Sequence, residues 1–116
     1  MSDKNHCINY IELPSTDLKQ TKQFYANAFQ WTFTDWGDEY VSFTGAGVDG
    51  GFRADGEIQP QPNGVLVVLY ADDLEACLDQ VTTAGGQIVK PVFSFPGGKR
   101  FQFKDPSGNE LAVWSE

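Results

Sequence analysis

Two glutamates, Glu12 and Glu110, lie within predicted strands that are otherwise largely apolar. A carboxylate in such a place can serve as a general base or contact a ligand, and two together can recruit a hard cation. The alternative is that each glutamate lies at a solvated rim or pairs with a basic residue, for which Arg53 and Arg100 are the candidates. We favour this alternative, because a buried carboxylate usually needs such a partner for stability alone.

Arg53 follows directly after Gly50, Gly51 and Phe52. Two glycines in a predicted strand indicate a β-bulge or a close approach of another backbone segment. An arginine at this place can bind the carboxylate or phosphate of a ligand through two hydrogen bonds. The competing interpretation, which we favour, is an ion pair with Glu12 or with another acid.

Three aromatic side chains, Tyr10, Tyr70 and Trp114, could together line a surface for a flat apolar ligand. The competing interpretation is that most aromatic residues form core or interface, and it applies to Trp31, Trp36, Tyr40, Phe93, Phe95, Phe101, Phe103 and Trp114.

Alternation along strands assigns side chains to faces. Those predicted to pack toward helices are Ile11, Leu13, Leu111 and Val113. Those predicted on the opposite face are Ile8, Tyr10, Glu12, Leu66, Val68, Tyr70, Glu110, Ala112 and Trp114.

The composition excludes several functional classes. The 116 residues include 8 basic and 16 acidic ones, a net charge of -8, which argues against nucleic acid or an anionic membrane as partner. His6 is the single histidine, so most metal centres and histidine-dependent triads are hard to assemble. Cys7 and Cys77 lie far apart in the sequence, and we expect reduced thiols in a cytoplasmic protein.

The first half of the chain is predicted to form a strand, a helix and three further strands. The strands cover residues 7–13, 31–36, 39–44 and 48–54. Asp17 and Gln20 form a capping-box pattern that predicts the helix start, and the helix should end near Gln30. The positions expected to be buried, at helical spacing, are Leu18, Thr21, Phe24, Tyr25, Ala28 and Phe29.

The second half repeats this order. Its predicted strands cover residues 65–71, 87–95, 99–104 and 110–115. Asp72 and Glu75 form another capping box, and Gly85 with Gly86 predicts the helix end. The helix positions expected to be buried are Leu74, Cys77, Leu78, Val81 and Ala84.

The two halves share equivalent landmarks, Asp17-Leu18 and Asp73-Leu74, which lie 56 residues apart (73 minus 17). Element order, cap position and length agree, and this predicts two βαβββ modules. Module one covers about residues 7–56, a linker about 57–63, and module two about 64–116. A unit of about 50 residues has little core of its own, so we expect one α+β domain over residues 1–116.

Several of these motifs occur together in one known family. They are Asp17-Leu18 before Phe24-Tyr25, then Phe29-Gln30-Trp31, Gly85-Gly86, and the turn Asp105-Pro106-Ser107-Gly108-Asn109 before an apolar strand. With these motifs the sequence resembles the vicinal oxygen chelate superfamily, which includes glyoxalase I, bleomycin-resistance proteins and extradiol dioxygenases. The resemblance covers about residues 8–114. It implies paired modules around a shared cleft, commonly in a dimer whose two chains can both contribute cleft walls.

The resemblance also implies positions for metal ligands, because metal-dependent members carry them on cleft-facing strands. The matching positions here are Tyr10, Leu66, Ala112 and one within residues 50–53. None of them is His or Glu. A divalent metal needs several converging donors, so we expect the family fold without its metal site and without a cofactor.

The sequence therefore predicts a metal-independent small-molecule binding protein of the glyoxalase and bleomycin-resistance type. We expect it to bind a small, partly aromatic or apolar ligand in the cleft between the modules, and to form a homodimer. The alternative is a glyoxalase-like lyase or isomerase that uses Glu12 or Glu110 as its general base. The predicted ligand-binding residues are Tyr10, Glu12, Arg53, Tyr70, Glu110 and Trp114.

Overall fold

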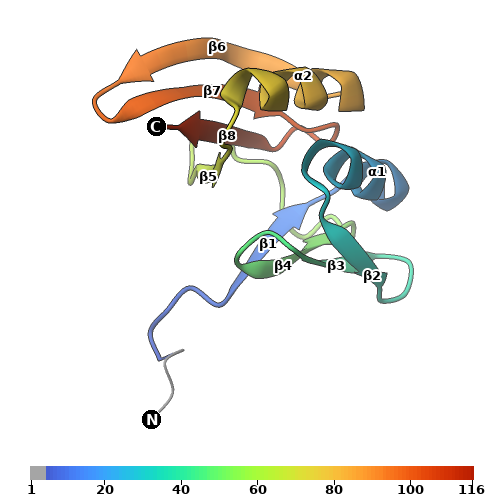
Figure 1. Cartoon of the computed structure of the whole chain (residues 1–116). Coiled ribbons are helices and arrows are strands. Elements are labelled where there is room, and N and C mark those ends of the chain that lie inside the picture. The colour runs from blue at the N-terminus through green and yellow to red at the C-terminus, as the bar shows by residue number, and fades with distance from the viewer. Residues whose placement is uncertain (1–4) are drawn as a thin grey trace.

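A computed structural model describes residues 5–116 and contains the two predicted βαβββ modules (Figure 1). Module one consists of β1 (Tyr10–Pro14), α1 (Leu18–Phe29), β2 (Thr32–Asp35), β3 (Tyr40–Thr44) and β4 (Asp49–Arg53). Module two consists of β5 (Val67–Tyr70), α2 (Leu74–Ala84), β6 (Gln87–Phe95), β7 (Gly98–Lys104) and β8 (Glu110–Ser115). The two modules form one α+β domain, as the sequence predicts.

Each module builds its own four-stranded mixed sheet. The strand order is β1-β4-β3-β2 in module one and β5-β8-β7-β6 in module two. The first strand of each module runs parallel to the fourth, and the other neighbours are antiparallel. The second sheet therefore repeats the topology of the first. Within residues 5–116 neither helix is long and apolar enough to cross a membrane.

Helix α1 begins and ends as predicted. The carboxylate of Asp17 accepts a hydrogen bond from the backbone N–H of Gln20, which satisfies one of the donors left open at a helix start. The helix ends at Phe29, and Gln30 closes it in the left-handed conformation, with φ of 61°.

Helix α2 begins one residue later than the predicted cap. Its cap is Asp73 rather than Asp72, and the Asp73 carboxylate accepts from the backbone N–H of Ala76. The reason lies in the preceding strand, because Ala71 still donates its N–H to the carbonyl of Trp114. Asp72 is therefore part of the turn between strand and helix.

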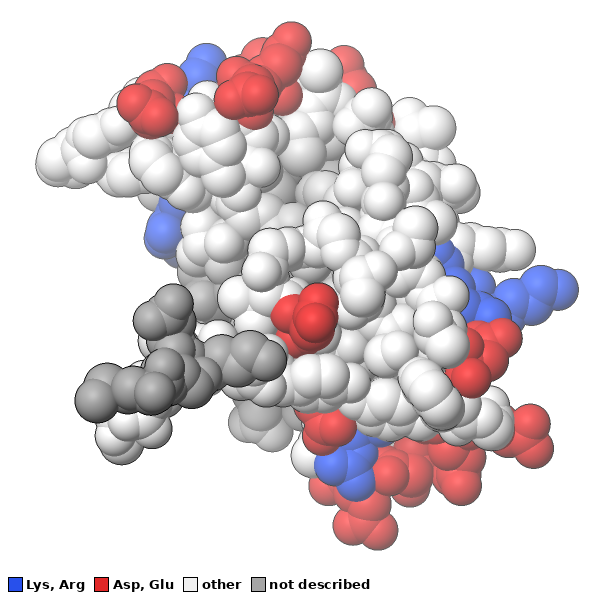
Figure 2. All heavy atoms as spheres, turned by 60° about the horizontal axis from the view of Figure 1, so that its bottom comes forward, with Lys and Arg blue, Asp and Glu red and all other residues white. Residues whose placement is uncertain are grey.

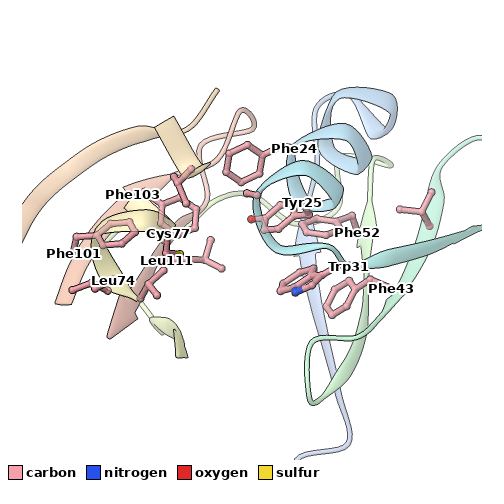
Figure 3. Packing of buried hydrophobic residues seen from close by; sticks show 14 residues of the cluster. Phe24, Tyr25, Trp31, Phe43, Phe52, Leu74, Cys77, Phe101, Phe103 and Leu111 are labelled. Atoms are coloured by element: carbon pink, nitrogen blue, oxygen red, sulfur yellow. The ribbon is translucent and has the colours of Figure 1, made fainter. Parts of the chain in front are cut away.

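Helix α1 contacts both sheets and holds the centre of the core (Figure 3). The Phe24 ring lies 5.9 Å from that of Phe103 in β7, and the Tyr25 ring lies 4.9 Å from that of Phe52 in β4. The predicted helix positions that are buried are Thr21, Phe24, Tyr25, Ala28, Leu74, Cys77 and Val81. Those that pack partly buried against the core are Leu18, Phe29, Leu78 and Ala84.

A buried polar cluster, the intermodule clasp, joins the turn before β8 to module one. The Asp105 carboxylate accepts hydrogen bonds from the Tyr25 hydroxyl at 2.7 Å, the Asn109 amide at 2.9 Å, and the backbone N–H groups of Ser107 and Asn109. The Asn109 amide also donates to the carbonyl of Pro14. Burial raises the pKa of Asp105, although these hydrogen bonds lower it. The turn motif that carries the family resemblance is thus a tie between the modules.

The first strand of each module is shorter than predicted, because its partner ends. β1 begins at Tyr10 rather than at residue 7, since Tyr10 already pairs with Asp49, the first residue of β4. β5 likewise covers only the residues that pair with β8. In module two the outer strand β6 pairs irregularly with β7, with register shifts on both sides of Lys90.

Candidate functional site

Each sheet packs one face on the helices and turns the other face away, and the candidate residues lie on the second face. Ile11 and Leu13 turn toward the helix side, and Leu111 and Val113 are fully buried, as alternation predicts. The open face of module one includes Tyr10, Glu12, Tyr40, Ser42, Asp49, Gly51 and Arg53. The open face of module two includes Val68, Tyr70, Lys90, Arg100, Gln102, Lys104, Glu110, Ala112 and Trp114.

The open face of module one carries a continuous network of hydrogen bonds. Tyr40 lies at its centre and shares a hydroxyl–hydroxyl hydrogen bond with Tyr10. The Tyr40 hydroxyl also donates to Glu12 Oε2 at 2.9 Å. Desolvation raises the pKa of Tyr40, and the hydrogen bonds to Tyr10 and Glu12 raise it further, so its hydroxyl remains a donor.

Arg53 completes this network and is paired with two acids. Its Nη1 atom lies 3.4 Å from Glu12 Oε1, and its Nη2 atom lies 2.8 Å from Asp55 Oδ2. The hydrogen bond from Arg53 holds the pKa of Asp55 below its usual value. The favoured interpretation of Glu12 and Arg53, an ion pair, therefore describes their arrangement in the structure.

Gly50 permits the close approach of a backbone segment, as predicted, whereas Gly51 faces a side chain, and the register of β4 shows no bulge. A Cβ atom at Gly50 would stand 2.2 Å from the carbonyl oxygen of Ile11. A Cβ atom at Gly51 would stand 2.2 Å from the Tyr40 hydroxyl and 2.5 Å from its Cζ atom. The Tyr40 ring thus occupies the space that a side chain at position 51 would fill.

The sequence did not single out Tyr40 as a site residue, because it was grouped with the core and interface aromatics. The signal that could have found it is the glycine pair, which leaves room for a ring from the neighbouring strand. Trp36 belonged to the same group, but its side chain is 62% exposed and donates to the hydroxyl of Ser42. Trp36 is therefore not a core residue, whereas Trp31, Phe101 and Phe103 are buried as predicted.

The open face of module two has a different character. The Gln102 amide donates to Glu110 Oε2 at 2.7 Å, so Glu110 is held by a neutral partner. Arg100, the second candidate partner of the glutamates, forms no ion pair with either of them. The pairing considered for Glu110 and Arg100 is thus absent, because the Arg100 side chain lies over aromatic rings instead.

A row of aromatic side chains continues from Arg100 across this face. The guanidinium carbon lies 5.3 Å from the ring centre of Phe93 and 5.9 Å from that of Phe95. The Phe95 and Trp114 rings are 6.3 Å apart, and the Trp114 and Tyr70 rings meet edge to face at 5.1 Å. Tyr70 is 48% exposed, so one end of the row is open to solvent.

Two pockets lie where β1 approaches β5. One, of about 360 Å³, has both Glu12 and Glu110 in its wall, together with residues of the linker. The other, of about 440 Å³, is lined by mainly apolar residues and includes Tyr70. The structure therefore brings the two glutamates to one pocket, while the remaining candidates Tyr10, Arg53 and Trp114 lie outside both linings.

The positions that match the family's metal ligands do not supply a donor set. Tyr10 is engaged with Tyr40, and Leu66 and Ala112 have hydrocarbon side chains. Within residues 50–53 of β4 the open-face residues are Gly51 and Arg53, neither of which is an acid or an imidazole. Among residues 5–116 no three or more His, Cys, Asp or Glu side chains gather where they could hold a metal ion. His6, the single histidine, is exposed.

Comparison with known proteins points to one family. Residues 7–113 match the family described as the Glyoxalase/Bleomycin resistance protein/Dioxygenase superfamily. A Didymella fabae protein named "Glyoxylase-like domain-containing protein" is 32% identical over 117 residues, covering 91% of this chain and 91% of that protein. "Putative glyoxylase CFP32" of Mycobacterium bovis is 29% identical over 119 residues, covering 91% of this chain and 44% of that protein. The chain thus spans less than half the length of this mycobacterial relative.

Among solved structures, the fold is similar to that of a glyoxalase-related enzyme from Fulvimarina pelagi. The TM-score is 0.78 at 19% sequence identity, and the match covers 94% of this chain and 87% of that one. At this identity the likeness establishes the shared fold.

Proposed function

We propose that this protein, which belongs to the Glyoxalase/Bleomycin resistance protein/Dioxygenase superfamily, is a metal-independent binding protein for a small, partly aromatic or apolar molecule. The observation that carries the proposal is the row of aromatic side chains on the open face of module two. Tyr70 and Trp114 present ring surface there without being closed into the core. Aromatic rings of this kind bury a flat ligand by stacking and by removing apolar area from water.

The donor chemistry at the family's metal positions supports metal independence. A phenol, a leucine and an alanine cannot form the coordination shell that a divalent ion needs. Metal analysis of protein purified without a chelator tests this part of the proposal. A tightly held divalent ion at one equivalent per chain would overturn it.

Thermal unfolding in the presence of a planar, neutral aromatic probe such as 2-naphthol tests binding. The melting temperature should rise with probe concentration, because a ligand that binds only the folded state stabilises it by mass action. Trp114→Ala should remove the shift. Trp36→Ala is the matched control, because Trp36 is an exposed tryptophan on module one, and it should leave the shift intact. Equal loss in both variants, or no shift in the parent protein, contradicts the proposal.

A second candidate function is a glyoxalase-like lyase or isomerase, and the pocket that Glu12 and Glu110 share favours it. Two relatives carry glyoxylase in their names, which supports this second candidate function. Glu110 is the better base of the two, because its partner is an amide, whereas Glu12 is bound to the Arg53 guanidinium. Glu110→Gln should then abolish turnover while the fold is retained, and Glu12→Gln should reduce it less. Turnover that survives both changes eliminates these bases.

The homodimer predicted from the family resemblance is part of this proposal. Its support is the apolar area that remains outside the core, including the side chains of Tyr10 and Tyr70, which are 44% and 48% exposed. A second copy that covers an open face would remove this area from water. Sedimentation equilibrium measures the mass directly, and a monomer at micromolar concentration would contradict the prediction.

A further inference from the structure

The two arginines of this acidic protein differ in their partners. The chain carries 16 acidic and 8 basic residues, and Arg53 lies within 4.0 Å of carboxylate oxygens of both Glu12 and Asp55. Arg100 has no carboxylate at such a distance within the part of the chain that the structure describes. Figure 2 shows one face of the molecule, on which acidic groups outnumber basic ones. A guanidinium without an acidic partner therefore calls for a physical reason.

The surroundings of Arg100 leave hydrogen-bonding capacity unused. Its Nε atom is buried and has no hydrogen-bond partner within residues 5–116. A buried donor without an acceptor lowers stability unless a bound group supplies one. The rings of Phe93 and Phe95 hold the guanidinium by cation–π contacts, and these contacts orient it without consuming its N–H groups.

The two carboxylates on this face are already engaged. Glu116, beyond Trp114, accepts from the Tyr70 hydroxyl at 3.4 Å, and Glu110, at the other end of β8, accepts from the Gln102 amide. Neither of them comes within ion-pair distance of Arg100. The counter-charge of the guanidinium must therefore come from solvent or from a ligand.

We propose that Arg100 anchors the carboxylate of an aromatic carboxylic acid whose ring stacks along Phe95, Trp114 and Tyr70. This inference rests on the proposed binding function and names the class of ligand. The forked N–H groups of an arginine match the two oxygens of a carboxylate, and the adjacent rings match a flat ring system. The row from Arg100 to Tyr70 thus offers an anionic anchor point at one end and aromatic surface along its length.

A singly charged anion fits this face better than a doubly charged phosphate. Besides Arg100, the charged groups on this face are Lys90, which lies opposite Gln102 in the register, Lys104, which lies opposite Glu110, and the carboxylates of Glu110 and Glu116. Of the two carboxylates, Glu116 lies closer to Arg100 along β8, and it repels a dianion more strongly than a monoanion. The single negative charge of an aromatic carboxylate balances the single positive charge of the Arg100 guanidinium.

Isothermal titration calorimetry with 2-naphthoate and with its neutral isostere 2-naphthamide tests this inference. The parent protein should bind naphthoate at least about tenfold more tightly, as a charge-assisted pair of hydrogen bonds implies. Arg100→Gln should remove this preference and leave naphthamide affinity within about twofold. Arg100→Lys should retain only part of the preference, because an ammonium keeps the charge but not the fork.

Arg53→Gln is the matched control, because Arg53 is the arginine that already has acidic partners. It should leave the preference for naphthoate unchanged, and circular dichroism confirms that each variant is folded. Equal affinity for the two probes in the parent protein, or a preference that persists in Arg100→Gln, overturns the inference. If naphthamide then still binds and Trp114→Ala abolishes that binding, the proposed binding function holds while the inference about Arg100 fails. If neither probe binds the parent protein, both proposals fail.

Discussion

The two modules place an arginine and an aromatic residue in equivalent rows, but in exchanged positions. In module one Tyr40 of β3 pairs with Arg53 of β4, and in module two Arg100 of β7 pairs with Trp114 of β8. The rows are equivalent, because the first-strand residue of each, Pro14 or Tyr70, lies three residues before the helix cap. The same backbone frame therefore holds the same two kinds of side chain in opposite order.

This exchange decides what each arginine meets. On β4 Arg53 lies beside β1 and the following loop, where Glu12 and Asp55 are within reach. On β7 Arg100 lies beside β6, where it meets Phe93 and Phe95. The arginine of module one is thus paired with acids of its own module, while the arginine of module two retains an unused donor. The two modules share one fold, and exchanging the arginine and the aromatic residue between two neighbouring strands gives their open faces different properties.

The largest expected effect comes from breaking the intermodule clasp. The clasp belongs to the turn before β8, and the turn before β4 in module one has no equivalent. Asp105→Ala leaves the Tyr25 hydroxyl, one N–H of the Asn109 amide and two backbone N–H groups without their acceptor. We expect a loss of about 3 kcal/mol in the free energy of unfolding, measured by urea denaturation. Asp38→Ala in the exposed β2–β3 turn is the control and should change stability by less than about 0.5 kcal/mol. Equal effects of the two substitutions would show that the clasp adds nothing.

A smaller effect should follow from making module one resemble module two at position 51, where the equivalent residue of β8 is Ala112. Gly51→Ala would push its Cβ atom into the Tyr40 ring and cost about 1–2 kcal/mol, as the hydrogen bonds of Tyr40 are lost. A double-mutant cycle with Tyr40→Ala measures the coupling. The cost of Gly51→Ala should shrink in the Tyr40→Ala background. Strict additivity would rule out the contact as its cause.

The third prediction concerns two equivalent helix positions, Thr21 in α1 and Cys77 in α2. Burial raises the pKa of the Cys77 thiol from 9.0 to about 11. Its contribution to stability is therefore fully present below pH 9 and is lost as the pH rises through 11, with a magnitude on the order of 1 kcal/mol. Denaturation curves between pH 8 and 11 should show a steeper decline for the parent protein than for Cys77→Ala. Parallel curves would contradict the prediction.

The smallest effects should come from the helix-to-strand ion pairs, of which each module has one. Lys22 lies 2.9 Å from Asp35 in module one, and Lys99 lies 3.9 Å from Glu75 in module two. Lys22→Ala should cost less than about 1 kcal/mol, and Lys99→Ala should cost less still, because both pairs are solvated. The difference between the two variants should vanish in about 1 M salt, which screens surface charges. A salt-independent cost would point to packing of the lysine stem instead.

The repeated element order was predictable because it rests on local signals. Alternating apolar residues, Asp17 as a helix cap and Gly85 as a helix end are read from neighbouring positions. The limits of strands depend on a distant partner. Residues 7–9 alternate like a strand, but no residue of β4 is available to pair with them. The choice between Asp72 and Asp73 likewise depends on where β5 leaves β8.

The sequence predicts which face of its own strand a candidate side chain takes, but it predicts less well which side chains meet across neighbouring strands. Alternation placed Tyr10 and Glu12 on one face, and the ion pair of Glu12 with Arg53 followed from their opposite charges. The position of Tyr40 across Gly51 depends on the register of β3 with β4, which no local pattern encodes. The sequence groups Phe93 with the core aromatics, and simple alternation cannot assign its face because β6 pairs irregularly with β7.

The irregular outer strand of module two has a consequence for the behaviour of the protein at high concentration. β6 is nine residues long and forms one edge of its sheet. A long regular edge offers unpaired backbone groups to which other chains can add strands, which is a route to aggregation. Pro91 supplies no N–H donor, Lys90 adds a charge, and the register shifts around Lys90 break the regular spacing. This edge is thereby protected against strand addition, even though the adjoining sheet face carries aromatic surface.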